Sequence, residues 1–161
     1  MHKRYVLLLV FLFTFFTFSQ NVFAQFFPFD ESSVTGQKAK NFSVPTMSGS
    51  TLTVNETLFK NKTTLMFFWA TWCPHCREAL QDLKGRLAEL KDKKVQVILI
   101  DLGEDAGKVK QYLGNVKVDV DSGLDLDNSV AEQYGVVGIP TFVLVDATGT
   151  IKSVEHALPE I

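Results

Sequence analysis

Hydrophobic residues in this chain gather in short runs that polar, turn-forming segments separate. Two runs are apolar almost throughout, TLMFFWA at residues 64–70 and VQVILIDL at residues 95–102. Strands that are covered on both faces show such continuous runs, whereas half-exposed strands alternate. We therefore predict two central strands here, running parallel and joined by a right-handed crossover.

The segment between these two runs has the periodicity of an amphipathic helix. It begins at Pro74, because proline fits the first turn of a helix, and it ends within the lysine-rich residues 91–94. The apolar face is formed by Leu80, Leu83, Leu87 and Leu90. Two further short helices are predicted at residues 107–113 and 129–134.

The shorter apolar runs predict two hairpins and one edge strand. The expected strands are residues 42–45, 51–54, 116–120, 141–146 and 150–154. Ser48-Gly49-Ser50 and Ala147-Thr148-Gly149 supply the turns of the two hairpins. Strand–helix–strand order with a closing hairpin predicts the α/β class, with a central mixed sheet and an N-terminal β-hairpin.

Only the segment EHALPEI follows the last predicted strand, at residues 155–161. Pro159 limits this segment to about one helical turn. We therefore expect a short or truncated C-terminal helix. One apolar side of residues 141–146 would then remain uncovered and would favour self-association.

The first 24 residues differ in pattern from the rest of the chain. A basic start at residues 2–4 precedes a nearly unbroken apolar run at residues 5–18, and small residues end at Ala24. This order predicts a signal peptide, residues 1–24, that is cleaved after Ala24. The run is shorter than the roughly 20 residues of a spanning helix, so a membrane is a partner only if cleavage fails. The expected location is extracytoplasmic, in the bacterial periplasm.

Length and charge add limits to this organisation. The chain has 161 residues, which suits one domain, and we expect a leader at residues 25–35 followed by that domain at residues 36–161. The net charge is -2 at pH 7, and removal of Lys3 and Arg4 with the signal would bring it to about -4. Because no basic surface is indicated, nucleic acid is excluded as a partner.

The chain contains two cysteines, Cys73 and Cys76, at the start of the long predicted helix. In an exported protein a disulfide can persist. A bridge between these residues closes almost no loop, so it would contribute little to stability. The spacing therefore fits a structural bridge poorly, and half a metal site or a redox-active disulfide remain.

WATWCPHC at residues 69–76, the long helix after it, and GIPTFVLVD at residues 138–146 together resemble the thioredoxin superfamily. The leading hairpin, and the segment at residues 107–120 between the second central strand and the next helix, resemble its extracytoplasmic TlpA/ResA-like branch. The resemblance covers residues 36–154. The resemblance implies a thioredoxin-like three-layer sandwich and a protein thiol–disulfide oxidoreductase without a cofactor. It also implies cysteine-containing protein substrates and a membrane or soluble thiol–disulfide electron partner. Cytochrome c maturation and disulfide repair are the expected settings.

The resemblance also assigns roles to individual residues. It implies a Cys73–Cys76 disulfide in which Cys73 is the attacking thiolate and Cys76 the resolving thiol. It further implies a cis Pro140 and substrate binding by Trp72, Ile139 and Pro140. The physical chemistry agrees, since a helix N-terminus favours a thiolate at Cys73, and the backbone of Ile139 could pair with an extended substrate.

The dipeptide between the cysteines, Pro74-His75, leaves the direction of electron flow open. It resembles that of DsbA-type oxidases, whereas the rest of the chain resembles TlpA/ResA-type reductants. A histidine beside the sulfurs stabilises the thiolate and makes the disulfide more oxidising, by about 30 mV for each pKa unit. A DsbA-like thiol oxidant is therefore an alternative function.

Two positions depart from the family pattern. Phe67 stands where many relatives carry a buried Asp or Asn, and Ala79 stands where many carry a Glu. Cys76 must lose a proton to release substrate, so another acceptor is needed. The candidates are Glu104, Asp105 and Glu78, with the alternative that Glu104 and Asp105 are only a solvated loop pair.

Related chemistries fit the sequence less well. A peroxiredoxin needs a proline and a threonine before its cysteine, and Met66 and Ala70 occupy those positions. Haem attachment needs a histidine directly after the second cysteine, where the chain has Arg77. Neither activity is expected.

No metal site is expected either. Cys73, Cys76 and His156 would make an incomplete soft-metal set, although a non-catalytic copper-delivery protein on the same fold remains an alternative. The acidic residues Asp119, Asp121, Asp125 and Asp127 lack the glycine and glutamate of a calcium loop. We expect this acidic loop to cap the helix that begins at Ser129 instead.

Overall fold

The computed structural model describes residues 34–161, so the predicted signal peptide and nearly all of the predicted leader lie outside the described residues. The strands are β1 (Phe42–Pro45), β2 (Thr51–Val54), β3 (Thr64–Trp69), β4 (Gln96–Leu102), β5 (Ser122–Asp125), β6 (Thr141–Val145) and β7 (Ile151–Glu155). The helices are α2 (Glu56–Phe59), α3 (Pro74–Asp92), α4 (Ala106–Val116) and α5 (Ser129–Gln133). None of the helices in this part of the chain has the length and apolar character needed to cross a bilayer.

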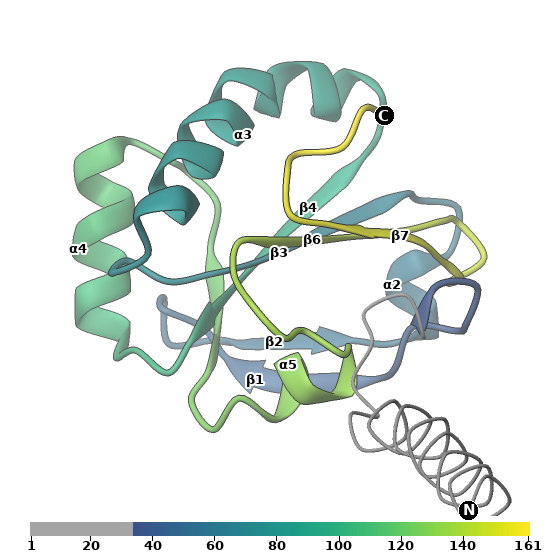
Figure 1. Cartoon of the computed structure of the whole chain (residues 1–161), viewed down its shortest axis with the longest axis horizontal. Helices are drawn as coiled ribbons and strands as arrows, with labels where there is room; N and C mark the ends of the chain where they lie inside the picture. The colour runs from purple at the N-terminus through teal and green to yellow at the C-terminus, as the bar shows by residue number, and fades with distance from the viewer. Residues whose placement is uncertain (1–33) are drawn as a thin grey trace, which may run out of the picture. The chain divides into compact units, whose positions relative to one another are not determined.

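A mixed five-stranded sheet in the order β5-β4-β3-β6-β7 forms the centre of the domain (Figure 1). β3 is the middle strand, parallel to β4 and antiparallel to β6, and all six of its residues are buried. This burial explains why the run shows no alternation. The two predicted central strands, their parallel pairing and the two predicted hairpins are confirmed.

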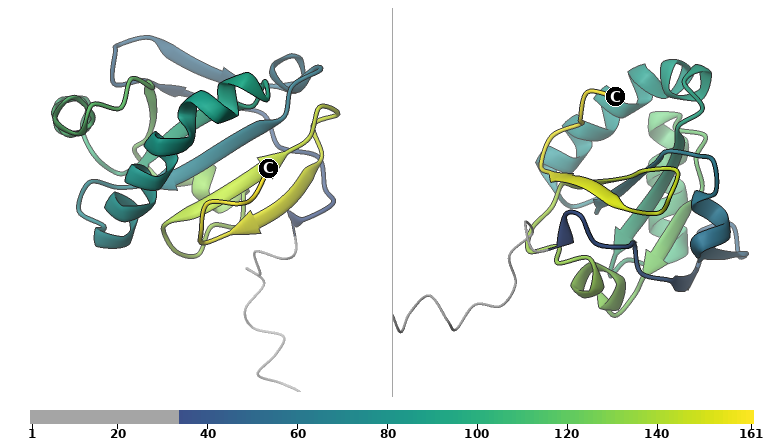
Figure 2. Two further views of the ribbon diagram at one scale, coloured as in Figure 1. Left: turned by 90° about the horizontal axis from the view of Figure 1, so that it is seen from above. Right: turned by 90° about the vertical axis from the view of Figure 1, so that its right-hand side faces the viewer.

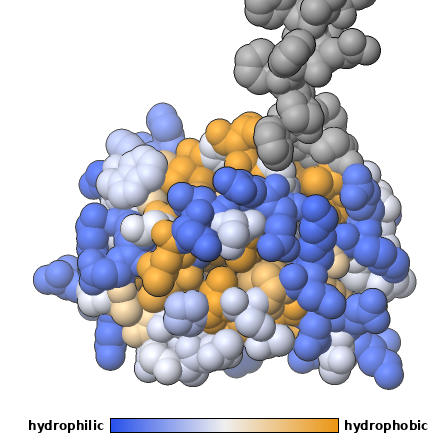
Figure 3. All heavy atoms as spheres, turned by 90° about the horizontal axis from the view of Figure 1, so that it is seen from below, coloured by the Kyte–Doolittle hydropathy of each residue, from blue (hydrophilic) through white to orange (hydrophobic). Residues whose placement is uncertain are grey.

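Helices and the N-terminal hairpin cover the two faces of this sheet (Figures 1 and 2). Leu65, Phe67 and Trp69 of β3 face one side and pack with α3 and α4. Met66 and Phe68 face the other side and pack with β1, β2, α2 and α5. The chain therefore has the expected three-layer sandwich. Figure 3 shows hydrophobic side chains at the surface among hydrophilic ones, on the side of α5 and the hairpin.

The hairpin β1–β2 rests on the edge strand β5. Thr46 and Gly123 form an isolated antiparallel bridge, and the Met47 N–H donates to the Ser122 carbonyl at 2.9 Å. A Cβ at Gly123 would lie 2.8 Å from Val44 Cγ2 and 2.9 Å from a Leu52 methyl carbon. Only glycine allows the hairpin to approach this closely.

The opposite edge strand, β7, is also contacted by the N-terminal part of the domain. The Gly36 N–H donates to the Ile151 carbonyl at 2.8 Å, and the Ile151 N–H donates to the Gln37 carbonyl at 2.9 Å. Lys38 forms a further bridge with Thr150. The stretch from Gly36 to Met47 thus pairs with both edges of the sheet.

The predicted edge strand at residues 116–120 is wrong, because the edge strand is β5. α4 continues through Val116 and ends where Lys117 adopts a left-handed conformation, with φ of 56°. The Val118 N–H then bonds to the Leu113 carbonyl at 3.0 Å, and the Val118 side chain is buried. Val116, Val118 and Val120, whose alternation led to the predicted strand, instead pack on the core at and after the end of α4. The short helix α2, capped by Asn55, was not predicted.

The C-terminal segment, residues 156–161, forms no helix, so the expected short C-terminal helix is corrected to an irregular segment. Leu158 and Ile161 pack against the core on the α3 side of the sheet. Most of β6 is fully buried, so the expectation of an uncovered side at residues 141–146 is wrong as well. Pro159 opposes a helix here, and the side chains of the segment cover the sheet without one.

Candidate active site

Cys73 and Cys76 lie at the N-terminus of α3 and are joined by a disulfide. Cys73 is the N-cap residue, and its Sγ accepts a hydrogen bond from the Cys76 N–H at 3.1 Å. Cys73 is 4% exposed and Cys76 is fully buried. A substrate sulfur can therefore reach only Cys73, and the helix N-terminus favours a thiolate there.

The loop before β6 lies against this disulfide. The Ile139–Pro140 peptide bond is cis, as the resemblance implied. Cys73 Sγ is 3.6 Å from the carbonyl oxygen of Ile139. The Thr141 hydroxyl donates to the Gly138 carbonyl at 2.6 Å and so ties the two ends of the loop together. The structure thus brings Cys73 and the Ile139–Pro140 peptide together.

Two grooves flank this loop and share Ile139 as a wall. One, of about 460 Å³, lies between α3 and the C-terminal segment and includes His75, Pro140 and His156. The other, of about 300 Å³, lies beside α5 and includes Trp72 and Val137, which are 60% and 62% exposed. An extended peptide that crosses Ile139 would have one groove on each side. Trp72 and Val137 thus place two large exposed apolar side chains in the groove beside Ile139.

His75 lies on the surface at the start of α3. Its side chain is 82% exposed, and Nδ1 is 3.4 Å from a carboxylate oxygen of Glu78. In the disulfide form the imidazole therefore pairs with Glu78. The predicted effect of His75 on the reduction potential stays a prediction, and it would act through solvent-screened charge.

Glu104 is buried beneath the loop that leads to Cys73. Its carboxylate accepts hydrogen bonds from the Thr71 N–H at 2.5 Å and from the Thr71 hydroxyl at 2.8 Å, and it forms an ion pair with Lys108. Burial raises the pKa of Glu104, but the bonds from Lys108 and Thr71 outweigh it and hold that pKa below its usual value. Asp105, in contrast, is exposed and caps α4 through Lys108 N–H at 3.0 Å. The alternative of a solvated pair is therefore wrong for Glu104.

Asp101 is a second buried carboxyl next to Glu104, and the sequence analysis missed it. It is fully buried in β4, and its Oδ1 accepts from the Glu104 N–H at 3.1 Å. Asp101 pairs with Trp69 in register, so it faces the α3 side of the sheet, as Trp69 does. Burial and the neighbouring Glu104 raise the pKa of Asp101 to about 8. Asp101 could have been singled out from the sequence, because an ionisable residue within an apolar central strand is seldom buried without a partner or a function.

Phe67 occupies the position where the family resemblance led us to expect a buried Asp or Asn. Its ring stacks on Phe142 with 4.3 Å between centroids and an interplanar angle of 5°. A second stacked contact joins Phe67 to Trp69 at 6.3 Å. The buried acid of this site is thus carried by β4, while β3 and β6 contribute an aromatic stack.

The acidic loop before α5 caps that helix, as expected. Asp125 accepts hydrogen bonds from the Val130 and Ala131 N–H groups at 3.2 and 2.8 Å, and Asp127 accepts from Ser129 N–H at 3.1 Å. Within residues 34–161, no group of three or more His, Cys, Asp or Glu side chains is placed to hold a metal ion.

Comparison with known proteins identifies the family of the chain and several relatives. A model of the AhpC/TSA family matches residues 35–154. The chain is 27% identical over 136 residues to thiol-disulfide oxidoreductase ResA of Bacillus cereus, covering 84% of this chain and 75% of ResA. It is 26% identical to ResA of Bacillus subtilis, covering 77% of this chain and 68% of that protein.

Solved structures give the same picture. A thiol:disulfide interchange protein DsbE from Chlorobium tepidum has a TM-score of 0.68 at 27% identity, covering 76% of this chain and 84% of that one. A thiol-disulfide oxidoreductase from Bacteroides fragilis has a TM-score of 0.67 at 29% identity, covering 77% and 93%.

Proposed function

The chain belongs to the AhpC/TSA family and is a thiol–disulfide oxidoreductase of the ResA and DsbE type, and from this premise we propose that it acts on cysteines of exported proteins. The observation that carries the proposal is the contact between Cys73 and the cis-proline loop, with Sγ 3.6 Å from the Ile139 carbonyl. This contact places the exchangeable sulfur beside a backbone edge that an extended peptide can pair with.

The reaction is a pair of thiol–disulfide exchanges. In the reducing direction, the Cys73 thiolate attacks one sulfur of a substrate disulfide, and the other substrate sulfur leaves as a thiolate that takes up a proton. Cys76, deprotonated, then attacks Cys73 Sγ and releases the second substrate thiol. Two electrons pass to the substrate, and the Cys73–Cys76 disulfide forms. A second thiol–disulfide protein must then reduce the Cys73–Cys76 disulfide before the next turnover.

Substrate recognition is assigned to the loop and to Trp72. The Ile139 backbone would pair with the substrate chain, and Pro140 and Trp72 would contact residues beside its cysteine. The grooves on either side of Ile139 support this assignment because each can accept a side chain of an extended peptide.

The proton from Cys76 needs an acceptor, and we assign that role to Glu104 acting with Asp101. Glu104 is buried and ionised, while Asp101 faces the same side of the sheet as α3. Asp105 and Glu78 are exposed; Asp105 caps α4, and Glu78 lies beside the His75 imidazole. They are therefore weaker candidates than the buried pair.

For direction and location, we propose a reductant that works outside the cytoplasm, in cytochrome c maturation or disulfide repair. The signal-like residues 1–24 support export, and the likeness to ResA and DsbE supports the reducing direction. The oxidant alternative rests on the Pro74-His75 dipeptide. Peroxidase activity is not proposed, because buried Met66 and Ala70 stand in the positions that a peroxiredoxin needs.

The decisive experiment combines turnover with trapping. The wild type should catalyse insulin reduction by dithiothreitol, and the Cys76→Ser variant should accumulate mixed disulfides with substrate while Cys73→Ser accumulates none. A Cys73→Ser variant that keeps turnover would contradict the assignment. Stoichiometric copper(I) binding by reduced protein without insulin reduction would favour the copper-delivery alternative.

A further inference from the structure

The C-terminal segment contacts the cis-proline loop through the side chain of His156. His156 Nδ1 lies 2.7 Å from the carbonyl oxygen of Pro140 and 3.4 Å from the Thr141 hydroxyl. A carbonyl oxygen can only accept, so the Nδ1 atom carries the proton in this bond. Sequence reasoning treated His156 only as part of an incomplete metal set, and the resemblance assigns it no role.

Two successive carbonyl groups of this loop therefore have different partners. The Ile139 carbonyl oxygen lies 3.6 Å from Cys73 Sγ, and the Pro140 carbonyl accepts the hydrogen bond from His156. Holding the Pro140 carbonyl limits rotation of the backbone next to Ile139. His156 thus influences where the substrate-binding edge lies relative to the reactive sulfur.

His156 also stands where the regular pairing of the last hairpin stops. The β6–β7 ladder ends with Phe142 opposite Glu155, and His156 is the next residue. Its imidazole donates to the carbonyl of Pro140, the residue just before β6. A side-chain hydrogen bond therefore follows the last backbone pair of the hairpin. A residue without a donor at this position would remove this hydrogen bond to the Pro140 carbonyl.

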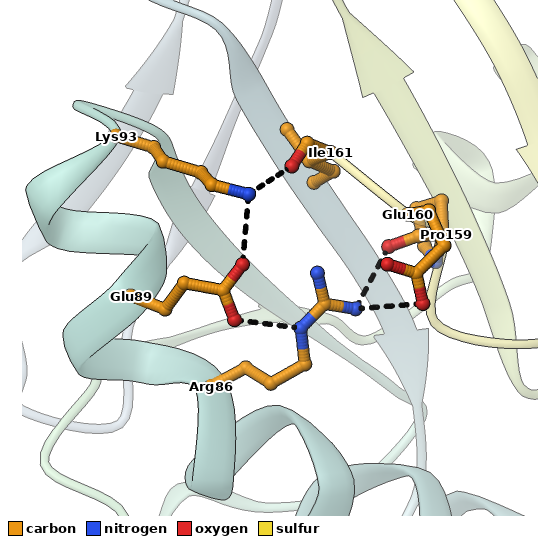
Figure 4. A network of polar contacts seen from close by, with 6 residues as sticks. All are labelled: Arg86, Glu89, Lys93, Pro159, Glu160 and Ile161. Atoms are coloured by element: carbon orange, nitrogen blue, oxygen red, sulfur yellow. Dashed lines mark hydrogen bonds and ion pairs between the residues drawn. The ribbon is translucent and has the colours of Figure 1, made fainter.

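The segment that carries His156 is held firmly at its other end (Figure 4). Arg86 of α3 donates from Nη1 to the Pro159 carbonyl at 3.0 Å, and Lys93 donates to the Ile161 carbonyl. Glu89 lies between these cations, 3.3 Å from Arg86 Nε and 2.8 Å from Lys93 Nζ. Because α3 also carries the cysteines, the segment links that helix to the cis-proline loop.

We propose that His156 is a positioning residue for thiol–disulfide exchange, holding the Ile139–Pro140 loop in the place that docks protein substrates against Cys73. This inference rests on the proposed function for its kinetic consequence, whereas its structural consequence is independent of turnover. A small thiol that does not pair with Ile139 needs no such positioning.

The test compares His156→Leu, which removes the donor, with His156→Asn, whose amide N–H can occupy the place of Nδ1. In insulin reduction, His156→Leu should raise KM about tenfold with kcat changed less than threefold, and His156→Asn should stay within threefold of wild type. The rate of disulfide reduction by dithiothreitol alone should be unchanged in both. An unchanged KM in His156→Leu, or Asn behaving as Leu does, would overturn the proposal.

A second pair of measurements separates positioning from stability and from turnover. Arg86→Gln loosens the same segment at its far end, so it should lower Tm while leaving KM within twofold of wild type. Amide ¹H–¹⁵N shifts of Ile139 and Cys73 should move in His156→Leu and not in His156→Asn, even if insulin proves to be no substrate. If His156→Leu does not fold, His156→Asp replaces it at neutral pH, because Asp matches Asn in shape but cannot donate when ionised.

Discussion

The carboxylate of Glu104 accepts hydrogen bonds from both the backbone N–H and the hydroxyl of Thr71, at 2.5 and 2.8 Å. Thr71 is two residues before Cys73, so a side chain from the loop after β4 fixes the approach to the reactive sulfur. Charge-assisted bonds of this kind are stronger than neutral ones, and leaving a buried donor unpaired is costly.

Replacing Glu104 by alanine should therefore destabilise the protein by about 1–3 kcal/mol. It should also slow the release of substrate from the mixed disulfide, because the proposed proton acceptor is lost. Urea denaturation and stopped-flow measurement of mixed-disulfide decay check the two effects. Asp105→Asn is the matched control, since asparagine also caps a helix, and it should leave both quantities near wild type. Equal release rates in the Ala variant and wild type would remove Glu104 from the proton path.

Asp101 makes a prediction for the pH dependence of stability. Its pKa is raised to about 8 in the folded protein from 3.8, so between these values the folded state binds more protons than the unfolded state. The contribution of Asp101 to folding is therefore present at low pH and is lost as pH rises toward 8, with a slope of at most about 1.4 kcal/mol per pH unit.

The Asp101→Asn variant should show a flatter decline in the free energy of unfolding between pH 5 and pH 8. Asparagine keeps an oxygen for the Glu104 N–H, so the packing change is small. Urea denaturation at several pH values measures the slope. Identical slopes in the variant and the wild type would show that Asp101 does not carry the raised pKa.

His75 is predicted to make the disulfide more oxidising. In His75→Ala the Cys73 thiolate loses a nearby positive potential, so the reduction potential should fall, by no more than about 30 mV given the exposure of the imidazole. Glu78→Gln should shift it the other way, because the carboxylate that pairs with His75 is removed. The equilibrium constant with glutathione reports both, and an unchanged constant in His75→Ala would show that the histidine has no redox effect.

Gly123 is predicted to be intolerant of a side chain. A Cβ there would approach Val44 and Leu52 to within 2.9 Å, so Gly123→Ala should cost about 1–3 kcal/mol by pushing the hairpin away from β5. Gly85 in α3 is the control, because a Cβ there meets nothing within 4 Å, and Gly85→Ala should stabilise by up to about 1 kcal/mol. Similar melting temperatures for the two variants would contradict this account.

The elements with strong patterns were predictable from the sequence. β3 and β4 are apolar runs, α3 has a leucine face, and both hairpins carry turn residues, so local pattern and final structure agree. β5 was missed because its sequence, SGLD, has little strand character. Its glycine is required by the hairpin that packs on it, which is a tertiary constraint that no local pattern displays.

In the site, too, residues that belong to sequence motifs were predictable, whereas residues that act through long-range contacts were not. Cys73, Cys76, Ile139 and Pro140 belong to motifs and could be placed by resemblance. Thr71 and His156 act through contacts that join distant parts of the chain, namely the loop after β4 with the loop before α3, and the C-terminal segment with the loop before β6. Such pairings depend on the assembled sheet, so they became visible only in three dimensions.

The bonds that residues 36–47 make with β5 and β7 have a consequence for colloidal behaviour. A free edge strand presents unpaired N–H and C=O groups that can recruit a strand from another molecule. Here one stretch of chain occupies part of both edges, at Ser122 and Gly123 on β5, and at Ile151 of β7 and the preceding Thr150. These residues therefore protect the sheet against edge-to-edge aggregation at both of its open sides.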